Sequence, residues 1–239
     1  MKSREIDLWE KFDPAVYVKD NYAEIHDEDR KIIEILVRFY ERLPQLNHNI
    51  EIGGGPNLYP LMLALLCVRN IEVVDISARN LTYLRQQLQH PARNWYLFWD
   101  LLRDLSPLYK NIDLVETLNK KVAVKRGNIF QLPSNKYDLA SMFSVAESIT
   151  DKLEEFKFAC NKFINSVKSD GFLVAMFMEN SDGYTISGIN FPSVSVNSAL
   201  LENIFQPKTK NFNIYRIPKA EKALRLGYTG MLLFTGQKV

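Results

Sequence analysis

The pattern of apolar and polar residues divides the chain into predicted strands and helices. Short apolar runs bounded by turn residues are typical of buried strands, and apolar residues repeating every three or four positions are typical of amphipathic helices. The pattern predicts strands at 49–52, 71–75, 121–125, 137–143, 172–178, 212–217 and 231–236. It predicts helices at 29–43, 57–68, 78–88, 95–105, 151–167 and 198–204.

The order of these elements predicts an α/β fold of the Rossmann-like kind. Strands that alternate with helices form a mostly parallel sheet with helices on both faces. The link between the last two predicted strands, 218–230, lacks the apolar periodicity of a crossover helix. We therefore expect these two strands to form an antiparallel pair at the edge of the sheet.

Composition and charge narrow the class of protein. The 239 residues are 46% hydrophobic and 24% charged, which is typical of a globular protein with a substantial core. A net charge of +2 does not indicate a nucleic-acid-binding protein, which concentrates a basic excess on one face. The most basic stretch is expected to be solvated surface, and its cations are Lys208, Lys210, Arg216, Lys219, Lys222 and Arg225.

No segment of the chain has the pattern of a targeting or membrane segment. Residues Met1–Glu5 are charged and precede no apolar signal-peptide core, and the longest apolar run, 58–68, is too short to span a bilayer. Cys67 and Cys160 lie in apolar helical contexts, where a small buried hydrophobe is expected, and no metal-ligand spacing occurs. We expect a cytoplasmic protein, a monomer or weak homodimer, with no membrane partner and no metal.

A glycine-rich turn follows the first predicted strand. Gly53, Gly54 and Gly55 stand where this strand gives way to a helix. Glycine permits positive φ and a close approach of the backbone to a ligand, and this point of an open α/β sheet is a cofactor-binding position. The dinucleotide fingerprint has a third glycine where this chain has Leu58, which disfavours a pyrophosphate ligand. A plain turn without a ligand is the alternative.

A carboxylate stands at the end of the second predicted strand. Asp75 follows Gly53 by about twenty residues, the position at which an acidic side chain accepts hydrogen bonds from ribose hydroxyls. The alternative role is a helix N-cap, for which Ser77 is better placed. Together the two motifs indicate an adenosine cofactor, either NAD or S-adenosyl-L-methionine. The missing third glycine, and Glu51 before the turn, favour S-adenosyl-L-methionine.

A third candidate follows the strand at 121–125. Asn128 could meet the adenine amino group while Ile129 packs on the adenine ring. The alternative is an ordinary turn built from Gly127 and Asn128. The residues alone favour neither interpretation.

These motifs resemble those of the nicotinamide, phenylethanolamine and indolethylamine N-methyltransferase family, a family of class I S-adenosylmethionine-dependent enzymes. The resemblance covers about residues 12–239. Its specific segments are an N-terminal lid at 12–17 with Tyr22, a Gly-x-Gly-Pro-x-x-Tyr turn at 53–59, an Asp-x-Ser-x-x-Asn-Leu segment at 75–81, and a last strand and substrate loop at 170–174, 183–184 and 191–196.

The resemblance implies one domain over 1–239, with a helical cap at 1–45 and a core at 46–239 that includes a substrate loop at about 178–197. It implies that two tyrosines cover the methionine end of the cofactor, that Tyr59 binds its carboxylate and that Asp75 holds its ribose. Asn128 stands where the family commonly has Asp. The predicted cofactor-binding residues are Tyr17, Tyr22, Gly53, Gly54, Gly55, Tyr59, Asp75, Ile76, Asn80, Asn128, Ile129 and Phe143.

The acceptor residues are predicted from the same resemblance. Tyr184 would stack on or hydrogen-bond the acceptor, and Glu179 or Asp182 would anchor an amine. Glu147 is a further candidate from its position just past the strand 137–143, where it would face the sulfonium or the amine. The alternatives are solvated loop carboxylates and, for Glu147, a carboxylate at a helix start. The substrate-proximal Asp of the nicotinamide enzyme is matched here by Phe177, which argues against nicotinamide as the acceptor.

These observations predict transfer of a methyl group to a small molecule, at the nitrogen of an amine or N-heterocycle. Methyl transfer needs alignment and exclusion of water rather than a nucleophilic side chain, and an aromatic lid attracts the sulfonium cation. Another chemistry of the same cofactor is an alternative, either aminocarboxypropyl transfer or cyclisation that releases methylthioadenosine. A non-catalytic binding module and an NAD-dependent oxidoreductase are the remaining alternatives.

Overall fold

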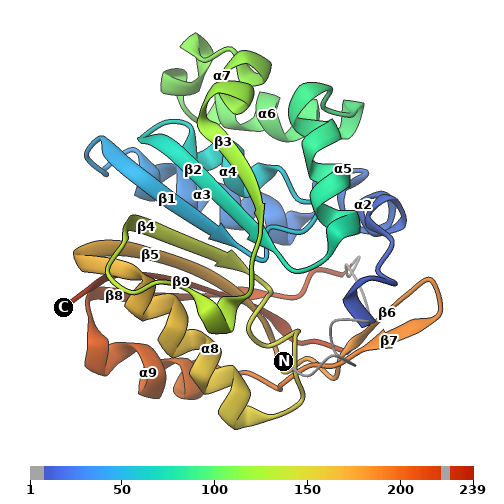
Figure 1. Ribbon diagram of the computed structural model, residues 1–239, viewed down its shortest axis with the longest axis vertical. Coiled ribbons are helices and arrows are strands. Elements are labelled where there is room, and N and C mark those ends of the chain that lie inside the picture. The colour runs from blue at the N-terminus through green and yellow to red at the C-terminus, as the bar shows by residue number, and fades with distance from the viewer. Residues whose placement is uncertain (1–7, 222–226) are drawn as a thin grey trace.

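A seven-stranded sheet forms the centre of the protein (Figure 1). The computed structural model describes residues 8–221 and 227–239. The charged N-terminal residues Met1–Glu5 and two cations of the basic stretch, Lys222 and Arg225, lie outside the described residues. The strands of the sheet are β1 (Leu46–Ile52), β2 (Val68–Asp75), β3 (Val122–Arg126), β4 (Tyr137–Phe143), β5 (Val167–Glu179), β8 (Thr209–Pro218) and β9 (Gly230–Lys238).

The strands lie in the order β3-β2-β1-β4-β5-β9-β8. The five strands from β3 to β5 are parallel, and β9 runs antiparallel to both β5 and β8. This confirms the predicted α/β fold and the antiparallel pairing of the last two strands. β8 takes the edge, and β9 lies between it and the parallel strands.

Helices cover both faces of the sheet (Figure 1). They are α2 (Pro14–Tyr22), α3 (Asp27–Tyr40), α4 (Tyr59–Ala64), α5 (Ala78–Gln89), α6 (Arg93–Leu105), α7 (Leu114–Lys121), α8 (Leu153–Ser166) and α9 (Ser198–Phe205). Buried residues of α2 to α7 form one core with the sheet, and those of α8 and α9 form the other. Within the described residues, every helix is too short or too polar to cross a lipid bilayer.

Strand alternation assigns neighbouring residues to opposite cores. Val73 packs in the core of α2 to α7, whereas Val74 packs in the core of α8 and α9. The same alternation along β5 places Met176 in the first core and Phe177 in the second. Both faces of these central strands are therefore buried, as expected for a parallel sheet between two helical layers.

The pattern missed α2 and began four strands three to five residues late, at β1, β2, β5 and β8. The predicted helix 57–68 is shorter, because α4 ends at Ala64 and the chain enters β2 at Val68. A continuous apolar run cannot distinguish a buried helix from a buried strand. The pattern also missed α7, which buries only Leu114 and Leu118, and a hairpin of β6 (Tyr184–Ile186) and β7 (Ile189–Phe191) inside the predicted substrate loop.

Candidate active site

A cleft opens at the carboxyl ends of β1, β2 and β4; we call it the glycine cleft. It encloses ≈ 890 Å³ including its open mouth, which is within the range of small-molecule sites. All predicted cofactor-binding residues except Tyr59 line it: Tyr17, Tyr22, Gly53, Gly54, Gly55, Asp75, Ile76, Asn80, Asn128, Ile129 and Phe143.

The three glycines of the turn are required by their surroundings. Gly53 and Gly55 have φ of 60° and 53°, which side chains other than glycine rarely adopt. A Cβ added to Gly54 would lie 2.5 Å from Cγ1 of Val73. The turn is held to β2, since the N–H of Gly53 donates to the carbonyl of Val74 at 2.8 Å. Its backbone therefore faces the cleft without a covering side chain.

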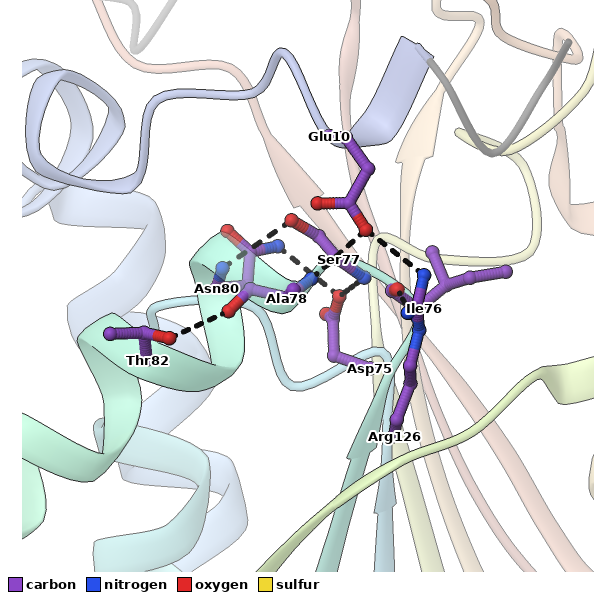
Figure 2. Close-up of polar contacts among 8 residues, drawn as sticks. All are labelled: Glu10, Asp75, Ile76, Ser77, Ala78, Asn80, Thr82 and Arg126. Carbon is purple, nitrogen blue, oxygen red and sulfur yellow. Dashed lines mark hydrogen bonds and ion pairs between the residues drawn. The ribbon is translucent and has the colours of Figure 1, made fainter.

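Asp75 lines the glycine cleft and is held by several hydrogen bonds, of which those from Ser77 and Asn80 are drawn in Figure 2. Its Oδ2 accepts from the N–H of Gly55 at 2.9 Å, and its Oδ1 accepts from the N–H of Ser77 at 2.8 Å and from Nδ2 of Asn80 at 3.3 Å. Burial raises the pKa of Asp75, and these hydrogen bonds oppose that rise. The N-cap of α5 is Ser77, so capping does not account for Asp75.

Asn80 leaves one acceptor unsatisfied beside this carboxylate. Its Oδ1 is buried and accepts no hydrogen bond from a described residue. Buried polar atoms without partners are costly and rare. Asp75 already receives three hydrogen bonds, and a carboxylate has about four lone-pair sites. The two hydroxyls of a ribose could donate one hydrogen bond to Asp75 and one to Asn80. This pair of side chains therefore fits the sugar of an adenosine.

Asn128 serves as a turn residue while also lining the cleft. Its Oδ1 accepts from the N–H of Phe130 at 3.0 Å and begins a short 3₁₀ turn, Ile129–Gln131. The alternative interpretation of this segment as a turn is therefore correct in part. Ile129 is buried in the wall of the same cleft. Both residues line the glycine cleft.

The two lid tyrosines come together on α2. The rings of Tyr17 and Tyr22 meet edge to face with centroids 5.8 Å apart, and Phe12 packs against Tyr17 at 5.1 Å. Nδ2 of Asn57 donates to the hydroxyl of Tyr22 at 3.2 Å, and Oδ1 of Asn57 accepts from the N–H of Tyr59 at 3.2 Å. Asn57 therefore links the aromatic lid to the end of the glycine turn.

Tyr59 lies behind this lid and is fully buried. Its ring stacks on Phe98 with centroids 5.6 Å apart and meets Tyr22 at 6.1 Å. Its hydroxyl makes no hydrogen bond of normal geometry with a described residue. The family-based expectation that Tyr59 binds a carboxylate is compatible with this unsatisfied hydroxyl, but in this structure the ring of Tyr22 is the one that lines the cleft.

Glu51 is a buried acid in the wall of the cleft. It is 1% exposed, and its carboxyl group receives a short hydrogen bond from the hydroxyl of Ser141. Burial raises the pKa of Glu51 to about 8, against a smaller opposing effect of Ser141. At neutral pH this side chain is therefore mostly uncharged.

A polar strap that the sequence analysis missed ties the N-terminal segment to the cleft. Oε1 of Glu10 accepts from the N–H of Ala78 at 3.2 Å and from Nη2 of Arg126 at 3.0 Å (Figure 2). Asp13 pairs with Arg79 at 3.1 Å. These contacts join exposed charges that lie far apart in the sequence, and no periodicity or motif marks them in advance.

A second cavity adjoins the glycine cleft; we call it the adjoining cavity. The two share a wall made of Tyr17, Tyr22, Ser144, Ser148 and Tyr184. The rest of the adjoining cavity includes apolar side chains from β5, β9 and the hairpin, and three carboxylates: Met176, Met178, Met231, Ile186, Phe191, Asp20, Asp29 and Asp182. A ligand here would lie directly beside a ligand of the cleft.

Tyr184 is the predicted acceptor residue that lies between the two spaces. It comes from β6, and its ring stacks on that of Phe191 with centroids 5.1 Å apart. Phe191 and Phe12 also meet, at 5.7 Å. The hairpin and the N-terminal segment therefore close one side of the site together.

Two other predicted acceptor residues line neither space. Nε of Arg216 donates to Oε1 of Glu179 at 2.8 Å, and the hydroxyl of Thr229 donates to its Oε2 at 2.8 Å; both contacts hold the pKa of Glu179 below its usual value. Oε1 of Glu147 accepts from the N–H of Met178 at 2.9 Å. Both carboxylates brace the end of β5.

The expectation that Phe177 lies close to the acceptor is wrong, because Phe177 also lines neither space. Phe177 is fully buried between Phe156 and Phe205, with ring centroids 6.0 and 6.1 Å away. The alternation of β5 turns it away from the adjoining cavity, into which Met176 and Met178 project. Phe177 therefore gives no information about the acceptor.

Comparisons with known proteins agree with this geometry. The model of the NNMT/PNMT/TEMT family matches residues 2–239. The chain belongs to this family. It is therefore an S-adenosylmethionine-dependent methyltransferase, and S-adenosylmethionine is its cofactor. No curated protein matches the chain in sequence.

Several solved structures share the fold at low sequence identity. An N-methyltransferase, NodS from Bradyrhizobium japonicum WM9 in complex with S-adenosyl-L-homocysteine, is 12% identical with a TM-score of 0.61 and covers 98% of this chain and 97% of its own. A DhpI–SAH complex is 10% identical with a TM-score of 0.64, over 100% and 98%. A possible histamine N-methyltransferase from Thermotoga maritima is 16% identical with a TM-score of 0.56, over 98% and 100%.

Proposed function

We propose that this methyltransferase transfers the methyl group to the nitrogen of a small amine or N-heterocycle. The observation that carries the proposal is the junction of the two spaces. The glycine cleft has the features of an adenosine site, and it meets a separate cavity at a wall of tyrosines. A cofactor in one space and an acceptor in the other would meet at Tyr17, Tyr22 and Tyr184.

The residues of the glycine cleft have distinct proposed roles. Asp75 and Asn80 would hold the ribose, with Ile76 beside it. The adenine would lie against Asn128 and Ile129, which stand together after β3.

The opposite end of the cleft would hold the methionine part of the cofactor. Here the glycine turn offers bare backbone, and the rings of Tyr17, Tyr22 and Phe143 line the space. Tyr59 is the nearest unsatisfied hydroxyl behind Tyr22.

The chemistry requires little from the protein beyond position. The cofactor supplies a methyl group on a positively charged sulfur. Aromatic faces attract cations, so the tyrosines of the shared wall suit that charge. The lid of α2 and the hairpin of β6 and β7 would exclude water and align the acceptor with the methyl group.

The adjoining cavity favours an acceptor that carries an amine. Its described lining has three carboxylates, Asp20, Asp29 and Asp182, and no lysine or arginine. The names of NodS and of the Thermotoga protein also point to nitrogen as the methylated atom. Tyr184 would contact the acceptor directly, while Glu179 and Glu147 would shape the cavity by holding the end of β5 behind Met178.

The test is an incubation with S-adenosylmethionine and a panel of amines and N-heterocycles, followed by mass spectrometry. The proposal predicts S-adenosylhomocysteine together with an acceptor that is heavier by one methyl group. Methylthioadenosine released without S-adenosylhomocysteine would instead favour aminocarboxypropyl transfer or cyclisation. Methylation of oxygen or carbon acceptors alone would contradict the nitrogen assignment.

A further inference from the structure

One carboxyl group of the adjoining cavity is buried with an oxygen atom that accepts no hydrogen bond of normal geometry from a described residue. Asp29, in the first turn of α3, is 2% exposed, and its Oδ2 accepts no hydrogen bond from a described residue. It lines the adjoining cavity and not the glycine cleft. Because burial of an unpaired carboxylate is costly, such a group marks a place where a ligand can supply the missing donor.

Among the described residues, the groups that shift the pKa of Asp29 are acidic or neutral. Its neighbour Glu28 is also buried, and Oε1 of Glu28 accepts from the hydroxyl of Tyr228 at 2.8 Å. Its Oε2 likewise accepts no hydrogen bond from a described residue, but Glu28 does not line the adjoining cavity. The hydroxyls of Tyr59 on α4 and Tyr22 on α2 interact electrostatically with Asp29. None of these groups can bring a positive charge to it.

The other two carboxylates of the cavity differ from Asp29 in exposure. Asp20 and Asp182 are exposed, so water screens their charges. No lysine or arginine of the described residues lines the cavity. Asp29 is therefore the carboxyl group whose charge a ligand would experience in a low-dielectric setting.

Burial raises the pKa of Asp29 to about 7. Repulsion by Glu28 adds to this rise, and the hydrogen-bonding effect of Tyr59 opposes it. Near neutral pH the group can therefore both lose and accept a proton. A general base works best when its pKa is close to the working pH.

We propose that Asp29 binds the nitrogen of the amine acceptor and takes the proton that this nitrogen must lose. This inference rests on the proposed function and names a residue for it. The ammonium gives one proton to the carboxylate, and the freed lone pair of the nitrogen forms a bond to the methyl carbon. The bond from that carbon to sulfur breaks with its electron pair staying on sulfur, and the proton on Asp29 later passes to solvent.

The remaining walls suggest the body of such an amine. Met176, Met178 and Met231 present flexible thioethers, and Phe191 presents an aromatic ring. Methionine packs well against aromatic and irregular apolar groups. The fitting acceptor is a primary or secondary amine with an apolar or aromatic body, for which benzylamine is a simple probe and benzyl alcohol its uncharged match.

The first test measures binding rather than turnover. Calorimetry at pH 7 with the S-adenosylhomocysteine-saturated protein would compare benzylamine with benzyl alcohol. We expect the amine to bind at least tenfold more tightly, and Asp29→Asn to abolish this preference while keeping the affinity for S-adenosylhomocysteine within twofold. The control Asp104→Asn removes an exposed carboxylate that lines neither space and should keep the preference.

The second test measures the proton role. With benzylamine as acceptor, Asp29→Asn should lower kcat/KM at least tenfold at pH 7. The loss should shrink as the pH approaches the pKa of the free amine, because the acceptor then arrives without the extra proton. A merely structural role of Asp29 would not produce this dependence on pH.

Each result supports or overturns the assignment. Equal binding of amine and alcohol by the unaltered protein, or a preference that survives in Asp29→Asn, would overturn it. A large loss of S-adenosylhomocysteine affinity in Asp29→Asn would place the residue at the cofactor instead. A protein that prefers amines through Asp29 but methylates none would contradict the proposed function and the proton role, whereas amine methylation unaffected by Asp29→Asn would contradict only the role of Asp29.

Discussion

At the residue scale, the buried acids of the site connect its chemistry with the stability of the fold. Burial raises the pKa of Glu51 to about 8 and that of Asp29 to about 7. The folded protein therefore holds protons that the unfolded chain releases at the ordinary pKa values of these groups. Folding stability must fall as the pH rises through the intervals between those values.

Glu51→Gln should make the stability of the protein less dependent on pH. The ordinary pKa of this group is 4.5 and its folded value is about 8, so its unfavourable contribution grows from about pH 4.5 to about pH 8 and stays constant above. We expect the free energy of unfolding of the variant to increase relative to the original protein across this interval. Urea titrations of the ligand-free proteins at pH 5, 6.5 and 8 would measure it.

The control for this prediction is Glu155→Gln, which alters a carboxylate that is paired with Lys152 near the protein surface. Its curve should lack the gain of Glu51→Gln between pH 5 and 8. Curves for Glu51→Gln and the original protein that stay parallel over the whole range would contradict the raised pKa.

Site residues could be predicted from the sequence where a motif fixes them. The glycine turn and Asp75 follow two strands whose carboxyl ends must lie side by side, so their proximity follows from the topology. Phe177, by contrast, was misinterpreted because a shift of one residue along a strand moves a side chain to the opposite face. Asp29 carried no signal, since an acid in the first turn of a helix is ordinary.

At the element scale, the segment from residue 8 to α2 covers one side of the glycine cleft. Its Trp9 and Phe12 line the glycine cleft, while its polar connections are the ion pairs of Glu10 with Arg126 and Asp13 with Arg79. These charges are partly exposed, and such pairs contribute about 0.2–1 kcal/mol each. The ion pairs therefore add weakly to the aromatic contacts of Trp9 and Phe12 with Phe191, at 4.9 and 5.7 Å, which also hold the segment over the cleft.

Glu10→Gln should loosen this segment and speed release of the cofactor product. The substitution removes the charge that meets Arg126 and weakens the bond to the N–H of Ala78. Loss of about 0.5–1 kcal/mol would lower the affinity for S-adenosylhomocysteine about two- to fivefold. Stopped-flow measurement of its dissociation rate would show the effect, which should shrink at high salt because the ion pair is screened.

The matched control is Glu154→Gln, which breaks the comparable surface pair with Lys157 on α8. It should leave the dissociation rate unchanged. A dissociation rate in Glu10→Gln equal to that of the original protein at low salt would show that the strap does not hold the lid.

Helices and strands with a clear repeat of apolar residues could be predicted from the sequence. Short elements with too few residues to show such a repeat could not. The strand at 137–143 coincides with β4, and the helix at 78–88 with α5 to within one residue. The hairpin of β6 and β7 has only three residues in each strand, too few for alternation to stand out. It is also the element that carries Tyr184 and Phe191 into the site.

At the scale of the whole molecule, the site gathers segments from nearly the full length of the chain. Trp9 and Tyr184 line the same cleft as the glycine turn of β1, so lid, sheet and hairpin meet only in the folded protein. A ligand that bridges them binds the native state and not the unfolded chain. Its binding free energy therefore adds to the free energy of unfolding.

S-adenosylhomocysteine should stabilise the protein against heat. At a concentration one hundred times its Kd, a ligand adds about 2.7 kcal/mol, which corresponds to an increase in Tm of about 5–10 °C for a chain of this size. Differential scanning calorimetry would measure the increase. Adenosine alone should give a smaller shift, because it leaves the methionine end of the cleft unfilled, and an unchanged Tm with the full ligand would contradict the account.

The most direct test of the central claim is the affinity of the protein for S-adenosylhomocysteine with and without Asp75. Isothermal titration calorimetry of the original protein should give a Kd in the micromolar range. Asp75→Ala should weaken binding about 10- to 100-fold, since a hydrogen bond to a charged group contributes about 1.5–3 kcal/mol, while the exposed control Asp104→Ala should bind normally. Equal affinity in the original protein and in Asp75→Ala would contradict the assignment of the glycine cleft to the cofactor.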